Sequence, residues 1–334
     1  MEQKRQNLYL FDTIIIFIIC FILFLLIKSP AFYAKVFIDG LSLFSSSVLP
    51  GLFPFMFFTR ILVSLDAIKK ASTLMHRPMK KLFNSPGISS FVMFISLISG
   101  YPIGAKLTAD LYENKVITLE DAKKTLTYSL TSGPIFVIGT VGAIILSNTK
   151  AGIIIFISHI ISNFITGFIL TRKKTTKQQP KPQNSINTYN INKIISQSME
   201  SSIHSILIVG GFITVFYCII EIVLSLKITK FILLPFEFIF SRIGVEPQIS
   251  RGLMSGIVEV TRGIKELSIY FNSSPQLVSS IICSLISFSG LSIILQSSSM
   301  LEKTTIQTRH LVLTKFMHAI FAFPICMILS SLFL

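Results

Sequence analysis

A Ser-Gly step interrupts an apolar segment at four places in the chain, and the four steps form two similar pairs. The steps are Ser99-Gly100, Ser132-Gly133, Ser255-Gly256 and Ser289-Gly290. The first two are 33 residues apart, the last two are 34 apart, and the pairs are offset by 156 or 157 residues. Glycine lets a backbone leave the helix, and polar groups freed inside a membrane need protein or ligand partners. Because internal repeats with broken membrane helices are typical of secondary transporters, the pattern indicates a repeated fold and a transport function.

The composition is that of a polytopic membrane protein. Hydrophobic residues make up 51% of the chain, charged residues only 13%, and the mean hydropathy is +0.72. A soluble domain carries roughly 25% charged residues. The net charge of +15 does not indicate a nucleic-acid partner, because the basic residues gather in short loops between apolar segments, as cytoplasmic loops do.

The first apolar segment, 11–27, follows Lys4 and Arg5 and resembles a signal peptide. No small-x-small cleavage site follows it, so we expect a retained anchor helix within residues 1–35. A first repeat is predicted over 36–170 and a second over 196–334. The polar, basic stretch between them, 171–195, is predicted to be a solvated cytoplasmic linker.

Lys and Arg counts predict the orientation of the first half. The loop 65–87 and the linker are both basic, so both should be cytoplasmic, yet three apolar segments lie between them. The conflict disappears if segment 88–105 is re-entrant, entering and leaving on the same side. Cytoplasmic loops of this half then hold 17 Lys or Arg residues, and external loops hold three.

The second half is expected to follow the same plan. Its segments 203–226, 249–267, 277–299 and 310–334 correspond to 41–64, 88–105, 126–147 and 152–170. Each repeat then has three crossings, an odd number, so the repeats are inverted. Seven spans result, with the N-terminus inside and the C-terminus outside. If every segment crossed instead, each repeat would have four spans and the repeats would be parallel.

The most distinctive candidate for a binding site is the bend in the first re-entrant segment. Its residues are Ser99, Gly100, Tyr101, Pro102 and Gly104, with Lys106 immediately after them. A bend of this kind exposes N–H groups, and a nearby cation favours an anionic ligand. The alternative is a plain turn followed by a lysine that reaches for the membrane surface.

The second break combines two hydroxyl side chains with a helix-breaking pair. Thr131 and Ser132 precede Gly133 and Pro134, so a helix should stop and restart here. The hydroxyls are candidates for ligand binding, for capping of the restarting helix, or for both.

Candidates in the second repeat follow its two breaks. Glu259, Thr261 and Arg262 come after the third break, where charged side chains are costly and tend to be functional or paired. A salt bridge between Glu259 and Arg262 is the structural alternative. Ser289 and Gly290 form the fourth break, and the amide of Gln296 follows as a ligand group or a contact to a neighbouring helix.

Two polar pairs lie within apolar segments: His159 with Asn163, and Lys315 with His318. For the histidines, interhelical hydrogen bonding is favoured over a proton relay.

Enzyme signatures are missing from the sequence. It contains no Walker A motif, GxSxG, HExxH or dinucleotide fingerprint. The four cysteines have no metal-ligand spacing. We therefore expect a protein that is not an enzyme and holds no cofactor or metal, with its coupling ion left open.

Four stretches carry a resemblance to a known family: SGYPIGAKLTADLYE, TSGPIFVIGTVG, GIVEVTRG and SFSGLSIILQ. Together they resemble the sporulation integral membrane protein family called YlbJ or SpoVV, within the nucleoside-recognition Gate-domain group. The resemblance implies an all-α fold similar to the core of concentrative nucleoside transporters, with inverted repeats, re-entrant hairpins and broken helices. It also implies transport of dipicolinic acid from the mother cell across the outer forespore membrane, with Tyr101 stacking on the substrate.

Two other functions stay open at the level of the sequence. One is a nucleoside or nucleobase transporter of the same architecture, and the other is a non-transporting sporulation membrane scaffold. The expected partners are a small organic anion and the lipid bilayer, and a homo-oligomer is compatible with the sequence.

Overall fold

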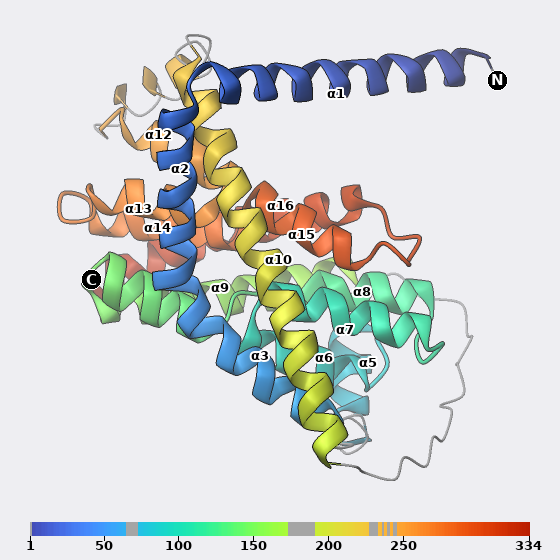
Figure 1. The fold of residues 1–334 in the computed structure, drawn as a ribbon. Coiled ribbons are helices and arrows are strands. Elements are labelled where there is room, and N and C mark those ends of the chain that lie inside the picture. Colours follow the sequence, from blue (N-terminus) through green and yellow to red (C-terminus); the bar gives the residue numbers. More distant parts are fainter. Residues whose placement is uncertain are drawn as a thin grey trace.

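The computed structural model describes residues 2–64, 73–172, 191–226, 233–235, 237–238, 241–242 and 246–334, and all regular elements in these ranges are helices (Figure 1). Most of the predicted linker and parts of the basic loop 65–87 and of segment 228–243 lie outside the described residues.

The N-terminal part begins with two helices that meet at a sharp bend. Helix α1 (Glu2–Lys28) and helix α2 (Pro30–Leu43) are bent by 105° at the residue before Pro30. Proline lacks an N–H and disfavours helical geometry in the preceding residue, so a straight helix cannot continue through Ser29. Helix α1 projects from the body of the molecule (Figure 1), and its apolar side chains are exposed, with Phe17 76% and Ile27 78% accessible. Such surface suits a lipid environment.

Helix α2 continues through a short π-helix, η1 (Phe44–Val48), into α3 (Leu49–Ser64). The first repeat then contains a hairpin, a broken helix and a long helix. The short α5 (His76–Phe83) precedes the hairpin of α6 (Ser89–Ser99) and α7 (Tyr101–Glu113). The broken helix consists of α8 (Leu119–Ser129) and η2 (Ile135–Ile145), and α9 (Thr149–Leu170) follows it.

The same sequence of elements occurs again in the second half. Helix α10 (Ile191–Ser225) leads to a hairpin of α12 (Ile249–Val258) and α13 (Val260–Ser268). The broken helix consists of α14 (Pro275–Phe288) and α15 (Gly290–Met300), and α16 (Thr308–Phe333) ends the chain. This order matches the repeat that the four Ser-Gly steps predict.

Three of the four predicted breaks coincide with interruptions of helices. Gly100 separates α6 from α7 with a φ of 88°, and Ser289 and Gly290 separate α14 from α15 with φ values of 77° and 68°. The chain is non-helical between Leu130 and Gly133.

The prediction of a break at Ser255-Gly256 is wrong. Both residues lie inside α12, and the chain leaves the helix at Glu259, which has φ −135° and ψ 113°. The physical reason is that Gly256 serves packing: a Cβ built on Gly263 of the other hairpin leg would clash with the backbone of Gly256. The carboxylate of Glu259 supplies the break, because it caps the N-terminus of α13.

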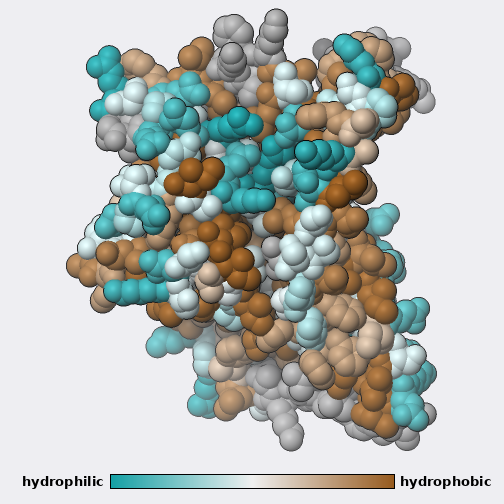
Figure 2. All heavy atoms as spheres, turned by 60° about the vertical axis from the view of Figure 1, so that its left-hand side comes forward, coloured by the Kyte–Doolittle hydropathy of each residue, from teal (hydrophilic) through white to brown (hydrophobic). Residues whose placement is uncertain are grey.

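Among the described residues, four helical stretches are long and apolar enough to cross a membrane, with α14 and α15 taken together as one of them: Thr149–Leu170, Ile191–Ser225, Pro275–Met300 and Thr308–Phe333. The bent pair Asp12–Lys28 and Pro30–Ser46 adds a fifth candidate. The other predicted crossings, 41–64 and 126–147, consist of shorter helices, because η1 and the break before η2 divide them. Figure 2 shows apolar side chains over much of one face of the molecule, with hydrophilic ones gathered near its top and edges.

Helices α9 and α16 pack against each other and run in opposite directions. The backbone carbonyl of His159 meets His318 at the middle of both helices. Ile155, one turn earlier in α9, shares a core cluster with Ala322 and Cys326, which come later in α16. The N-terminus and C-terminus lie on opposite sides of the molecule (Figure 1). This arrangement agrees with the expected inversion of the second repeat.

Candidate functional site

The interruptions of the helices meet in pairs, one pair in each repeat. A Cβ built on Gly133 would lie 2.6 Å from the carbonyl oxygen of Ile98, and one built on Gly100 would lie 3.8 Å from the amide nitrogen of Gly133. In the second repeat, a Cβ on Gly290 would lie 3.3 Å from the amide nitrogen of Val260. Each hairpin tip therefore packs against the broken helix of its own repeat, with the tip of the second hairpin at Glu259 rather than at the predicted Ser255-Gly256 step.

Tyr101 joins the two repeats at the centre of the molecule. It is the first residue of α7, directly after the positive-φ Gly100, and only 6% of its surface is exposed. Its hydroxyl donates a hydrogen bond to the carbonyl of Ile286 in α14, near the break in the other repeat. The Nζ of Lys315 lies 5.3 Å from the centroid of the Tyr101 ring.

Lys315 of α16 places its side-chain nitrogen, Nζ, beside the second break. The residue is 2% exposed, and its Nζ donates a 2.6 Å hydrogen bond to the carbonyl oxygen of Leu130. That carbonyl belongs to the non-helical stretch after α8. The Nζ also lies 3.1 Å from Nδ1 of His318. In the described part of the chain, no carboxylate forms an ion pair with Lys315.

Two buried histidines extend this hydrogen-bond network. Nε2 of His159 accepts from the backbone N–H of Ser132 at 3.1 Å, so its Nδ1 carries the hydrogen and donates to Oγ of Ser287 at 2.8 Å. Nε2 of His318 donates to the carbonyl of His159 at 3.0 Å, which leaves Nδ1 to accept from Lys315. The two rings stack with centroids 4.7 Å apart. The network therefore links α16, α9 and two of the breaks.

Beside this group the side chains pack closely, and the gap between them is too small to hold a water molecule. Tyr101, Leu130, Ser289 and Lys315 line it together with residues of α15 and α16. In the described residues, several buried polar atoms of the broken helices have no hydrogen-bond partner, among them Oγ1 of Thr131, Oγ of Ser292 and Nε2 of Gln296. Buried polar groups are normally paired, so these atoms are suited to a ligand or to water.

The predicted residues of the first bend divide into two groups. Tyr101 lies in the central group, whereas Ser99 bonds Thr59 through their hydroxyl oxygens at 2.8 Å. Gly104 packs against the carbonyl of Ser129, 2.5 Å from a Cβ built on it, and Pro102 lies in the first turn of α7. Lys106 forms a 2.8 Å ion pair with Asp110, and its side chain is 37% exposed. The buried cation at the centre is Lys315 rather than Lys106.

The predicted residues at the second break supply backbone and hydroxyl groups. Ser132 donates its N–H to His159, and Pro134 precedes η2 as its N-cap residue. No side-chain capping bond forms at this helix start, so the described structure does not give Thr131 or Ser132 a capping role.

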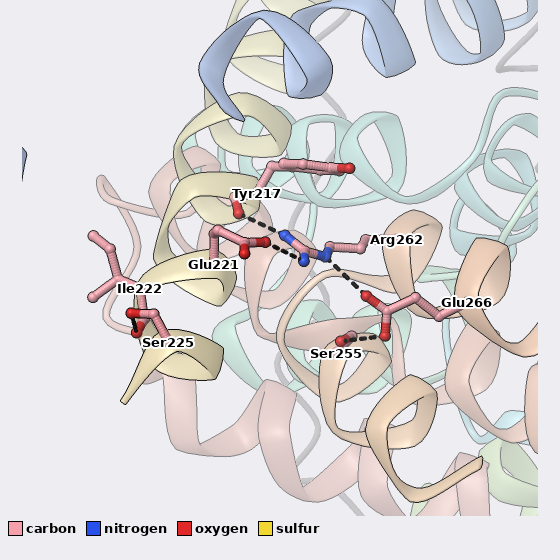
Figure 3. A network of polar contacts seen from close by, with 7 residues as sticks. All are labelled: Tyr217, Glu221, Ile222, Ser225, Ser255, Arg262 and Glu266. Carbon is pink, nitrogen blue, oxygen red and sulfur yellow. Dashed lines mark hydrogen bonds and ion pairs between the residues drawn. The ribbon is translucent and has the colours of Figure 1, made fainter. Parts of the chain in front are cut away.

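The charged residues of the second hairpin make a separate network, which Figure 3 shows. Nη2 of Arg262 lies 2.5 Å from Oε2 of Glu221 in α10, and its Nε lies 3.0 Å from Oε1 of Glu266. Nη1 donates to the carbonyl of Tyr217 at 3.1 Å, and Ser255 donates to Glu266 at 2.8 Å. Arg262 therefore links the hairpin to α10.

The expected salt bridge between Glu259 and Arg262 takes a different form. Glu259 is 1% exposed and accepts from the backbone N–H groups of Thr261 at 3.1 Å and Arg262 at 2.7 Å. The guanidinium group points instead to Glu221 and Glu266. Glu259 thus acts as a helix cap at the hairpin tip, against the backbone around Gly290.

Lys315, His318 and His159 form the centre, although they are not among the site residues predicted from the sequence. The signal was present, because a lysine inside a 26-residue apolar helix is rare and tends to be functional. What the sequence did not contain was the contact to Leu130, which is 185 residues away.

Comparison with known proteins supports the fold and the relationship inferred from the motifs. No family model matches the chain. The sporulation integral membrane protein YlbJ of Bacillus subtilis (strain 168) is 26% identical over 309 residues, which cover 87% of this chain and 76% of that protein.

Two solved structures of CNTnw variants share the fold. One, in an outward-facing state, has a TM-score of 0.57 and 12% identity, covering 86% of this chain and 76% of the other. The second, in an intermediate state, has a TM-score of 0.59 and 13% identity, covering 92% and 85%. At this identity the likeness shows the fold alone. The chain is therefore an integral membrane protein homologous to the sporulation protein YlbJ, with the fold of a concentrative nucleoside transporter.

Proposed function

We propose that the protein transports a small organic anion, and that this anion is dipicolinic acid, moved from the mother cell across the outer forespore membrane during sporulation. The transporter-like fold and the homology to a sporulation membrane protein support the setting. The observation that carries the choice of an anion is the buried ammonium of Lys315.

Lys315 has no acidic partner among the described residues, although one would be expected. A charged side chain near the middle of a membrane helix costs roughly 2.5–3.5 kcal/mol on insertion scales, and such residues usually pair. Its partners here are a carbonyl oxygen and an imidazole nitrogen, both uncharged. A carboxylate of the substrate would provide the missing counterion.

The surrounding groups suit a flat aromatic dicarboxylate. Dipicolinate is a planar pyridine dianion at neutral pH, and the ring of Tyr101 offers a surface for stacking. Thr131 and Gln296 supply polar atoms without partners in the described residues. Helices α7, η2 and α15 begin at the breaks, and helix N-termini favour negative charge.

The second candidate function is nucleoside or nucleobase transport. The fold shared with CNTnw favours it, as does the polar amide of Gln296. A neutral nucleoside would provide no counterion for a protonated Lys315, whereas a carboxylate would provide one, so we favour the anion.

Uptake into proteoliposomes separates these functions. We expect the purified protein to take up radiolabelled dipicolinate, with no competition from excess uridine. Lys315→Met should lower uptake at least tenfold, because the substrate loses its counterion. The matched control is Lys106→Met, which removes an ammonium from a half-exposed surface pair and should leave uptake within about twofold of wild type. Uptake of uridine but not dipicolinate, or equal uptake by the two variants, would overturn the proposal.

A further inference from the structure

The hydrogen-bond network at the centre places its exchangeable proton on Lys315. Nε2 of His159 faces an N–H donor, so that nitrogen carries no hydrogen. Nδ1 of His318 faces the lysine amine while its Nε2 donates to a carbonyl, so that ring also holds a single hydrogen. Both imidazoles are therefore neutral, and Lys315 is the remaining basic side chain of this network.

No fixed negative charge among the described residues faces Lys315. Helix α7 contributes Tyr101, α9 contributes His159, and α16 itself contributes His318. The broken helix of the second repeat contributes the hydroxyl groups of Ser287 and Ser289. The lysines of α8 point elsewhere, Lys123 to Glu120 and Lys124 to the carbonyl of Asn84.

The network also tolerates loss of the proton. A neutral lysine amine keeps two N–H bonds, and the structure gives Nζ two acceptors, the carbonyl of Leu130 and Nδ1 of His318. Both contacts can therefore persist when Lys315 is uncharged. An ammonium would leave its third N–H without an acceptor among the described residues, and its charge would face the Tyr101 ring but no carboxylate. A bound carboxylate would supply both an acceptor and a counterion.

We propose that transport is coupled to protons, and that Lys315 is the residue that carries the coupled proton; this inference rests on the proposed anion transport. Nζ takes one proton from water as the anion binds on one side of the membrane. It returns the same proton to water as the anion leaves on the other side. The empty site then resets as a neutral amine, so each cycle moves one anion and one proton in the same direction.

Wild-type protein in proteoliposomes tests the coupling directly. With an internal pH dye and the membrane potential clamped, addition of external dipicolinate should acidify the interior by about one proton per dipicolinate taken up. An inward proton gradient should drive accumulation above the external concentration, and no gradient should give equilibration only. Uptake of dipicolinate without proton movement would overturn the coupling and leave anion transport standing. Absence of both dipicolinate binding and exchange would overturn the proposed function itself.

Lys315→Arg tests the role of the lysine. Arginine stays charged in proteins, so this variant can pair with the anion but cannot reset as a neutral site. We expect dipicolinate binding and dipicolinate–dipicolinate exchange to be retained within about threefold, while accumulation driven by the proton gradient falls at least tenfold. Lys106→Arg is the matched control and should keep both activities. Proton coupling at the wild-type level in Lys315→Arg would overturn the assignment of the coupled proton to Lys315. If Lys315→Arg does not bind dipicolinate, the number of protons moved by the wild-type protein decides whether transport is coupled to protons.

Discussion

The guanidinium group of Arg262 lies 2.5 Å from the carboxylate of Glu221, and this ion pair joins the tip region of the second hairpin to α10. The arginine side chain is 8% exposed and the glutamate side chain is 25% exposed. The same guanidinium also binds Glu266 and the carbonyl of Tyr217, with the Tyr217 ring 4.6 Å away. The Arg262 side chain thus connects α13, in the hairpin, to α10.

We predict that Arg262→Leu lowers the free energy of unfolding by about 1–3 kcal/mol, because two partly buried carboxylates lose a hydrogen-bonded cation. Thermal unfolding in detergent measures the change. Lys106→Leu breaks an exposed i, i+4 pair and should cost less than about 1 kcal/mol. Equal losses in the two variants would show that the Arg262 network contributes no more than a surface pair.

The legs of the second hairpin approach each other through two glycines, Gly256 and Gly263. A Cβ on Gly263 would clash with the backbone of Gly256 and lie 2.7 Å from the carbonyl oxygen of Gly252. We therefore predict that Gly263→Ala separates the legs and lowers stability by about 1–3 kcal/mol, the usual cost of overpacking. The thermal midpoint in detergent is the measurement.

Gly211→Ala is the matched control for this substitution. A Cβ on Gly211 meets nothing within 4 Å, so this change should be neutral or slightly stabilising. Equal stability of Gly263→Ala and Gly211→Ala would mean that the two legs of the hairpin can move apart at no cost. That result would contradict the close packing of the legs in the structure.

The repeat was predictable because it leaves a local trace in the sequence. Ser-Gly steps occur in two pairs, 33 and 34 residues apart, and this spacing reveals the repeat. At Gly100 and Gly290 the glycine has a positive φ, which lets a helix stop inside the membrane. The break predicted at Ser255-Gly256 was wrong because a Ser-Gly step can serve either as a break in a helix or as a site of close helix packing. At Gly256 the absence of a side chain permits close packing against Gly263 in the other leg of the hairpin and against Leu285 in α14, and only these contacts distinguish that use from a break.

The composition of the site was less predictable than its position. Because Lys106 follows the first bend, the sequence favoured it as the cation of the site. In the structure Lys106 instead pairs with Asp110, one helical turn later, at the surface. Lys315 lies more than 180 residues from the break it contacts. Which charged residue reaches the centre depends on how α16 packs against α8 and α9, and that contact leaves no pattern in a single sequence.

The last prediction concerns the orientation of the chain in the membrane. It rests on the distribution of Lys and Arg in the first half, where the predicted cytoplasmic loops hold 17 of these residues and the predicted external loops hold three. Single cysteines at position 175, in the predicted linker outside the described residues, and at Leu334 would report the two sides. Cys20 is exposed and Cys218 is partly exposed, so both are first replaced by alanine, whereas the buried Cys283 and Cys326 can stay. In intact cells a membrane-impermeant maleimide should label Leu334→Cys and should label Thr175→Cys only after permeabilisation. Lys150→Cys, at an exposed position in the first turn of α9 that was predicted to be external, is the control and should label like Leu334→Cys. Labelling of positions 175 and 334 from the same side would be incompatible with seven spans and inverted repeats, because α9 and α16 would then have to cross in the same direction.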